Sequence, residues 1–332
     1  MQNGKCHVET VTNYYLRRKT MERYDKLVLC AEDGMTFNVT KGENGELIIK
    51  AMSIEKANSS LYSDQYVNPL IPEGYKHICG EWNNGFTIER ISEGSQLVWI
   101  PVGWLDSNGT LDGKKFDEKF GRRPLSTDIK FLEECIEETF NEFSVQIDSV
   151  RKYGGFYVSR YTMSLNEETG KIQSVKSAKP YILGDAHQYI EIASYFEDTK
   201  NVKSHLLFGS EYDSVLEWFK KTNARTRREI EVDSSSWGLY QDRYFAGEKL
   251  NTYFFLTGSC EDFCTNNIYD FTGGLLQMTQ EYHTEEERGY IVRGGYAVRS
   301  GKELPASHRR VYFDHAFFGM LNTGFRVALW IN

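Results

Sequence analysis

The chain has 332 residues, of which 40% are hydrophobic and 14% aromatic, and its formal net charge at pH 7 is −8. This much apolar and aromatic surface is enough for a large packed core, which excludes an intrinsically disordered protein. The acidic balance argues against nucleic acid as a partner, because phosphate binding requires a basic surface.

The first part of the chain has the pattern of a small appendage. Residues 1–20 contain no apolar signal-peptide core, and no stretch approaches the ~18 apolar residues of a membrane span, so we expect synthesis in the cytoplasm without a signal peptide. Residues 21–50 alternate short apolar and polar runs around "KGENGE", which predicts a hairpin. Residues 55–68 are the candidate linker. The predicted domains are a small β-rich N-terminal appendage with its linker, residues 1–66, and a larger domain, residues 67–332.

The larger domain mixes strands with amphipathic helices. "LVWIPVGWL" (97–105) is apolar almost throughout, as expected for a strand covered on both faces, and 153–162 is a strand entered through two glycines. Apolar spacing predicts helices over 128–143, 185–197 and 209–222. A long irregular region follows before strands resume. This order favours an α+β domain with an antiparallel sheet, few helices and much loop.

The last 43 residues place an irregular segment between two strand-like runs. Gly294 and Gly295 break the first run, where glycine permits a positive φ or a close backbone approach. Arg326 lies in the second run between apolar neighbours, so we expect a buried guanidinium that is fully hydrogen-bonded. The segment between these ends is either a displayed site or a long packed connection.

Five motifs, in order along residues 67–332, resemble the formylglycine-generating-enzyme (sulfatase-modifying factor) family. They are "LVWIPVG" (97–103), "GGFYVSRYT" (154–162), "FGSEYDSVLEWF" (208–219), "NIYDFTGGLLQMTQEYH" (267–283), and "VRGGYAV" paired with "NTGFRVAL" (292–298 and 322–329). The resemblance implies a single C-type-lectin-like domain. It also implies that the first strand, from Val98 to Val102, lies close to the last, from Phe325 to Ile331.

The chain departs from the family's pattern at the metal positions. Catalytic members bind copper through two cysteines that follow "RGG", where this chain has Arg299 and Leu304. Soft metals need thiolates, so the copper chemistry is not carried over, and we expect no catalytic residue and no metal. Family members also hold calcium with an asparagine and a glutamate, where this chain has Gly274 and Gln277. We expect that calcium site to be lost or weak, and therefore no cofactor.

Other chemistries have less support in the sequence. The six cysteines are expected to be free thiols, and Cys260 and Cys264 in "SCEDFC" lack a second ligand pair at zinc-ribbon spacing. His308, Asp314 and His315 form a conceivable iron triad, but neighbouring Asp314 and His315 would point apart, so exposed polar contacts are favoured.

The segment 296–321 is instead typical of a binding surface, because Tyr, Phe and Arg supply large contact areas at low entropic cost. We expect Arg309, Arg310, Tyr312 and His315 to be exposed. "VYFDHAFFG" (311–319) lacks Lys, Glu, Gln, Met and Trp, as retroelement-mutated adenine codons would require. The predicted ligand-binding surface comprises Tyr296, Arg299, His308, Arg309, Arg310, Tyr312, Phe313, Asp314, His315, Phe317 and Phe318.

Two functions of different classes follow from these observations. The first, which the missing cysteines favour, is a non-enzymatic recognition protein that binds a protein or carbohydrate on a cell surface. It would be a phage or prophage tail or surface protein diversified by a retroelement, a virion component, and compatible with a homo-oligomer. The alternative is a metal-dependent oxidoreductase of the formylglycine-generating or sulfoxide-synthase type with a replaced metal site.

Overall fold

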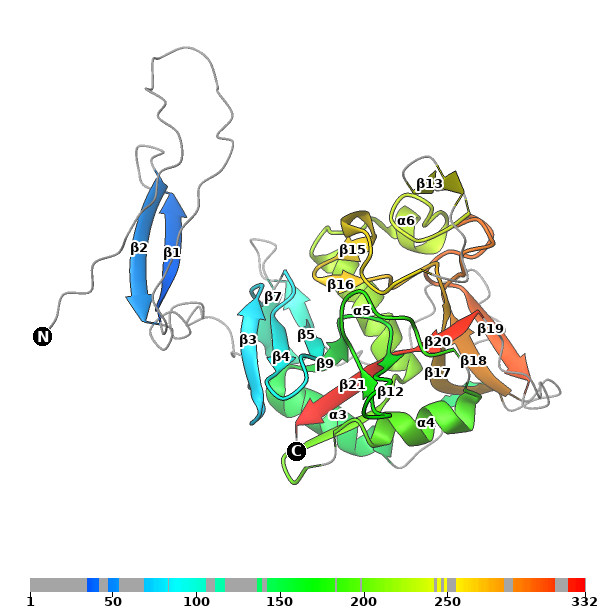
Figure 1. Cartoon of the computed structure of the whole chain (residues 1–332), viewed down its shortest axis with the longest axis horizontal. Coiled ribbons are helices and arrows are strands. Elements are labelled where there is room, and N and C mark those ends of the chain that lie inside the picture. The colour runs from blue at the N-terminus through cyan, green and yellow to red at the C-terminus, as the bar shows by residue number, and fades with distance from the viewer. Residues whose placement is uncertain are drawn as a thin grey trace, which may run out of the picture. The chain divides into compact units, whose positions relative to one another are not determined.

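The computed structural model places the chain in two compact units, Met1–Asp64 and Gln65–Asn332. The described residues are 35–41, 47–53, 69–82, 84–105, 111–116, 136–138, 142–182, 184–197, 199–241, 244–245, 248–249, 255–283, 289–313 and 322–331. In the first unit, β1 (Met35–Lys41) pairs antiparallel with β2 (Leu47–Ser53) (Figure 1). This is the hairpin that "KGENGE" predicts. Within the described residues, no helix has the length and apolar content needed to cross a membrane.

The second unit is an α+β fold with few helices and mostly antiparallel strands. Its larger sheet has the order β12-β21-β9-β5-β4-β3, and every neighbouring pair in it is antiparallel. The bounds of its strands are β3 Tyr75–Cys79, β4 Thr87–Arg90, β5 Gln96–Pro101, β9 Gly155–Ser159, β12 Val202–Leu206 and β21 Val327–Ile331. β5 and β21, the predicted first and last strands, lie in this one sheet with β9 between them. All residues of β9 and β21 are buried, as expected for central strands covered on both faces.

The smaller sheet has the order β19-β18-β17-β20, with β8 also paired to β17. Its strands are β8 Ile136–Glu138, β17 Leu276–His283, β18 Gly289–Arg293, β19 Arg309–Phe313 and β20 Thr323–Phe325. Only β17 and β20 pair in parallel within it. Four short pairs complete the strands: β6 (Gly103–Leu105) with β7 (Leu111–Phe116), β10 (Ser164–Leu165) with β11 (Ile172–Gln173), β13 (Tyr244–Phe245) with β14 (Glu248–Lys249), and β15 (Cys264–Thr265) with β16 (Ile268–Tyr269).

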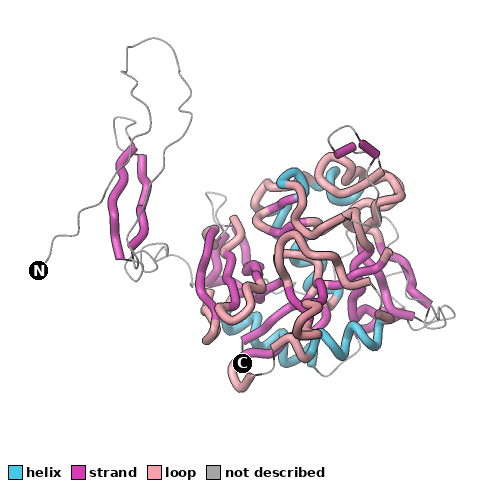
Figure 2. The backbone as a smooth tube through the Cα atoms, viewed as in Figure 1, coloured by secondary structure: helices cyan, strands magenta, loops and turns pink. Residues whose placement is uncertain are grey.

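The helices are α3 (Glu142–Tyr153), α4 (Ala186–Ser194), α5 (Gly209–Lys221) and α6 (Arg227–Glu231), with a 3-10 turn at Glu261–Phe263. α4 and α5 confirm two of the three predicted helices. α4 begins at a capping box in which Asp185 accepts from the backbone of Gln188 at 2.8 Å. Figure 2 shows how much of the remaining chain in this unit is loop.

The third predicted helix, over 128–143, is wrong where the structure describes it. Ile136–Glu138 is strand β8, which pairs antiparallel with the Glu281–His283 end of β17, and the helix α3 starts only at Glu142. Residues 128–135 and 139–141 lie outside the described residues. Pairing with a buried strand outweighs the weak local helix preference of this stretch.

Candidate functional site

The two glycines that begin the C-terminal segment are both required by the backbone. Gly294 has φ +70°, in the left-handed region, and its N–H donates to the carbonyl of His308 at 2.9 Å. A Cβ on Gly295 would lie 2.4 Å from the carbonyl oxygen of Leu304 and 2.5 Å from the ring of Tyr240. The chain is therefore drawn tightly together at the two ends of the segment 294–308.

The segment 294–308, called here the C-terminal loop, is packed along its inner side. Its contacts go to residues 234–241, where Ser234 accepts from the N–H of Ala306 at 2.9 Å. The hydroxyl of Tyr240 donates to the carbonyl of Leu304 at 2.7 Å. A Cβ on Gly301 would lie 2.3 Å from the backbone nitrogen of Ser235, so the two segments touch through their backbones. The loop thus has a fixed conformation.

The outer side of the C-terminal loop carries the exposed part of the predicted surface. Tyr296 is half-buried and accepts from Nε of exposed Arg299 at 3.3 Å, while Val298 is 37% exposed. Lys302 is exposed in the same loop, where its Nζ lies 3.9 Å from Asp233, and Arg310 is exposed on β19, which follows the loop. We call Tyr296, Val298, Arg299, Lys302 and Arg310 the loop face. Of the remaining predicted residues, His308 is half-buried.

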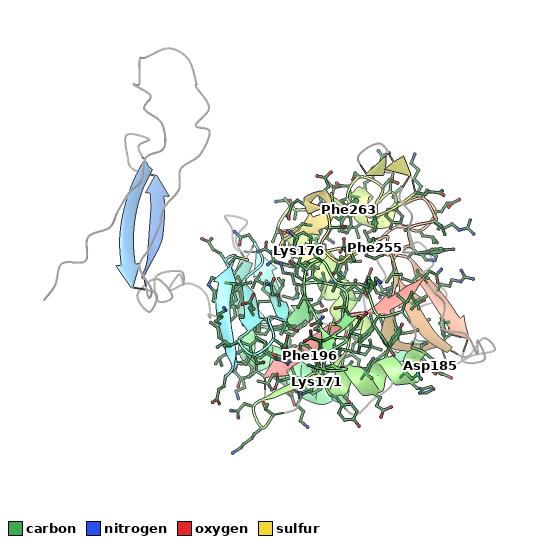
Figure 3. The ribbon with its side chains drawn as sticks, viewed as in Figure 1. Lys171, Lys176, Asp185, Phe196, Phe255 and Phe263 are labelled. Atoms are coloured by element: carbon green, nitrogen blue, oxygen red, sulfur yellow. The ribbon has the colours of Figure 1, made fainter. Side chains whose placement is uncertain are left out.

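A further apolar side chain lies near the loop face and was not singled out from the sequence. Leu256, 40% exposed, follows Phe255, whose ring would lie 2.9 Å from a Cβ on Gly274. Val298 follows Ala297, whose N–H donates to the carbonyl of Gly274 at 3.1 Å. Leu256 and Val298 therefore each directly follow a residue that contacts Gly274; Figure 3 labels Phe255. No periodic pattern in the sequence marks Leu256.

The predicted exposure of Arg309 and Tyr312 is wrong. The side chain of Arg309 is 4% exposed and Tyr312 is 3% exposed. Both lie on β19, which pairs with β18 so that Arg309 faces Arg293 and Tyr312 faces Tyr290. The cause is coverage of the sheet on both faces: Arg309 reaches Asp213 on α5, whereas Tyr290, the cross-strand partner of Tyr312, packs against the ring of His187 on α4. Even an edge strand is buried in such a sandwich, so the two residues leave the predicted binding surface.

Arg309 is instead part of a ring of four buried charges. Arg293 bridges Asp213 at 2.5 Å and Glu281 at 3.0 Å, and Arg309 bridges the same two carboxylates at 2.5 and 3.5 Å. Arg293, Asp213 and Glu281 have fully buried side chains. Burial by itself lowers the pKa of Arg293, but the charges of Asp213 and Glu281 outweigh it and raise that pKa. The ring joins α5, β17, β18 and β19, and its two arginines lie at the strand ends that flank the C-terminal loop.

The two carboxylates of this ring, Asp213 and Glu281, were not predicted from the sequence. Asp213 lies on a predicted helix and Glu281 in a strand-like run, where a single acid normally indicates the solvent side. Glu281 lies within β17, whose residues are buried apart from Tyr282, and the sequence alone does not reveal that burial. Gly209 shows the tightness of the packing, because a Cβ there would lie 1.7 Å from Glu281 Oε1.

Arg326 is fully buried and ties three segments together. Its guanidinium donates to the carbonyls of Ser159 at 2.9 Å, Arg160 at 3.2 Å and Tyr269. Burial lowers its pKa to about 10, and the nearby charge of Asp270 opposes that shift. Burial likewise raises the pKa of Asp270 to about 6, with the backbone N–H of Gly258 and Arg326 opposing. This pair lies in the core rather than on the loop face.

The remaining predicted positions divide into three groups. The side chain of Phe313, and Asp314, His315, Phe317 and Phe318 entirely, lie outside the described residues. At the family's copper positions, Arg299 is exposed and Leu304 half-buried. At its calcium positions, Gly274 has φ +63°, and buried Gln277 donates to the carbonyl of Leu275 at 3.2 Å. Across the described part of the chain, no three His, Cys, Asp or Glu side chains are grouped as metal ligands.

Away from the loop face, an open groove of about 500 Å³ is lined by residues from 73–75, 90–92 and 196–197. The cation in this groove is Arg90, whose guanidinium contacts Glu93 at 2.8 Å and Glu197 at 2.6 Å. Cζ of Arg90 lies 4.1 Å from the ring centroid of Phe196. The guanidinium is thus occupied within the protein.

No family model matches the chain, and no curated protein matches it. Among solved structures, the chain is similar to one titled "Crystal Structure of CarF", with a TM-score of 0.36 and 11% sequence identity. That similarity covers 54% of this chain and 87% of the other.

Proposed function

We propose that this protein is a non-enzymatic recognition protein with a C-type-lectin-like domain of the formylglycine-generating-enzyme type, and that the loop face binds its ligand. The observation that carries the proposal is that the exposed side chains of the loop face lie on a loop whose backbone is tightly packed. Gly294 and Gly295 fix the start of the C-terminal loop. The four-charge ring holds together β18 and β19, the strands before and after the loop. Binding surfaces are commonly placed on loops held by a rigid scaffold in this way.

The chemistry of the loop face favours a protein or carbohydrate ligand on a cell surface. Tyr296 offers a ring and a hydroxyl, Arg299 a guanidinium, and Val298 an apolar contact. The exposed guanidinium of Arg299 donates to the Tyr296 hydroxyl at 3.3 Å and feels the charge of Glu303. A guanidinium in that state is available to a carboxylate or hydroxyl of a ligand. We further propose that the protein is a phage or prophage surface component and that a retroelement diversifies its C-terminal segment.

The test compares two double variants of the labelled full chain on a panel of fixed bacterial cells and on a glycan array. Tyr296→Ala with Arg299→Ala removes the ring and cation of the loop face. Tyr195→Ala with Lys171→Ala removes one tyrosine and one cation that are exposed elsewhere in the same unit. We expect the loop-face variant to lose at least about tenfold in affinity for whatever the parent binds, because anchor residues commonly contribute ~2 kcal/mol or more.

Three outcomes would contradict the proposal. Binding that survives the loop-face change but is lost with the control would place the ligand elsewhere. A large fall in the melting temperature of the loop-face variant would show that these residues hold the fold. Conversion of a cysteine-containing sulfatase-type peptide, or tight stoichiometric copper binding, would favour the metal-dependent oxidoreductase.

A further inference from the structure

Two free cysteines from distant parts of the sequence lie in segments that touch. Cys79 ends β3, and Cys264 begins β15, which turns through Asn266 and Asn267 into β16. Both thiols are partly exposed. Neither belongs to the loop face or to the four-charge ring, so the proposed function does not involve them.

Backbone contacts lock these two segments together. A Cβ on Gly80 would lie 2.0 Å from the carbonyl oxygen of Gly85 and 2.7 Å from Nδ2 of Asn267. A Cβ on Gly85 would lie 2.2 Å from the carbonyl oxygen of Asn266. Asn267 also donates from Nδ2 to the carbonyl of Gly85 at 2.7 Å and holds φ +65°. The loop after Cys79 and the turn after Cys264 therefore form one close-packed unit.

Polar groups are directed at both sulfur atoms within this unit. Nη1 of Arg160 and Nδ2 of Asn267 each lie 3.8 Å from Sγ of Cys79. Burial raises the pKa of Cys264, while the hydroxyl of Tyr269, the charge of Arg160 and the backbone N–H of Asn267 oppose that shift. Arg160 and Asn267 thus face both cysteines, and Nε of Arg160 donates to the carbonyl of Asn267 at 3.1 Å.

We propose that Cys79 and Cys264 form an oxidisable thiol pair, in which a hydroperoxide oxidises Cys79 and Cys264 then closes a disulfide between the two segments. Cys79 is assigned the first step because Nη1 of Arg160 and Nδ2 of Asn267 each lie 3.8 Å from its sulfur and can donate to the oxygen that the sulfur acquires. Cys264, whose pKa is raised by burial, serves as the resolving thiol.

The chemistry balances with hydroperoxide as the oxidant. The Cys79 thiolate attacks one peroxide oxygen, so an S–O bond forms, the O–O bond breaks, and the departing oxygen leaves as water or alcohol after protonation. The sulfur atom has then lost two electrons to the peroxide. The sulfur of Cys264 attacks the sulfenic sulfur, the S–S bond forms, and the S–O oxygen leaves as water with the proton of the second thiol.

The test uses the reduced full chain treated with hydrogen peroxide, followed by alkylation of free thiols and peptide mapping. We expect a linked peptide that contains Cys79 and Cys264, while partly exposed Cys260, four residues from Cys264, is still alkylated. In Cys264→Ser, we expect a sulfenic acid at Cys79 that dimedone traps. Asn267→Asp should slow oxidation of Cys79 roughly tenfold, because it replaces an amide donor 3.8 Å from the sulfur with a negatively charged acceptor.

The control for Asn267→Asp is Asn223→Asp, because Asn223 is exposed and also has a positive φ, +56°. This change should leave the rate at Cys79 unaltered. The proposal is overturned if Cys79 and Cys260 are oxidised at equal rates. It is also overturned if Cys264 pairs with Cys260, or if Cys79 proceeds to the sulfinic acid without a link to Cys264.

Discussion

Arg309 and Arg310 are adjacent arginines on one strand with opposite environments, and they give a matched test of the four-charge ring. Arg309 contacts Asp213 at 2.5 Å and Glu281 at 3.5 Å from a side chain that is 4% exposed. Arg310 is exposed on the other face of β19. We expect Arg309→Ala to destabilise the fold strongly and Arg310→Ala to leave it nearly unchanged.

The expected magnitude follows from the charges left behind. Without Arg309, two fully buried carboxylates share the single guanidinium of Arg293. Removing one partner from a buried ion pair typically destabilises a protein by ~3–5 kcal/mol, whereas exposed substitutions usually stay within about ±0.5 kcal/mol. For a unit of this size, the larger change corresponds to a fall of roughly 6–20 °C in the melting temperature.

The assay is thermal and urea unfolding of both variants followed by circular dichroism. A double variant, Asp213→Asn with Arg309→Met, removes one charge of each sign and leaves the Arg293–Glu281 pair intact. It should be less destabilised than the sum of its single variants, because no excess charge stays buried. Equal small effects from Arg309→Ala and Arg310→Ala, or strict additivity in the double variant, would refute the ring as a coupled buried network.

Two further predictions concern other buried positions. Burial raises the folded-state pKa of Asp270 from 3.8 to about 6. The neutral carboxyl of Asp270 therefore contributes stability that is fully present below about pH 4 and is lost as the pH rises through about 6. Asp270→Asn should therefore be stabilising by up to about 3 kcal/mol at pH 7, and urea unfolding from pH 4 to 7 should show a flatter profile than the parent. An identical pH profile would show that Asp270 titrates normally. Gly295→Ala should destabilise by ~1–3 kcal/mol, because its Cβ would lie 2.4 Å from the Leu304 oxygen; an unchanged melting temperature would show that the loop can yield.

The local pattern of the sequence was sufficient for much of the framework. The turn residues of "KGENGE" predict the β1–β2 hairpin, and apolar spacing predicts α4 and α5, because each of these elements is specified by short-range periodicity and caps. β8 was misassigned because its conformation depends on pairing with a strand more than a hundred residues away. Long-range pairing leaves no trace in local periodicity.

The candidate site was harder to predict for the same reason. The run from Arg309 to Phe313 reads as polar and aromatic, and Arg309 and Tyr312 in it are buried because α4 and α5 cover opposite faces of its sheet. Burial of Arg309 also depends on Asp213, 96 positions away, to neutralise it. The approach of Cys79 to Asn267 spans 188 positions and arises from two close backbone contacts that no spacing rule encodes.

The position of β21 in the larger sheet has a consequence for synthesis on the ribosome. β21 fills the place between β12 and β9, yet Val327 follows Ser159, its hydrogen-bond partner, by 168 residues. At a translation rate of ~5–20 residues per second, β21 is synthesised roughly 10–30 s after β9 and β12. During that time the edges of β9 and β12 that pair with β21 are unpaired. An unpaired edge in a nascent chain is a template for wrong pairing with another chain. Yield of native protein should therefore depend on what shields β9 and β12 during that interval, such as a chaperone or slower expression at low temperature.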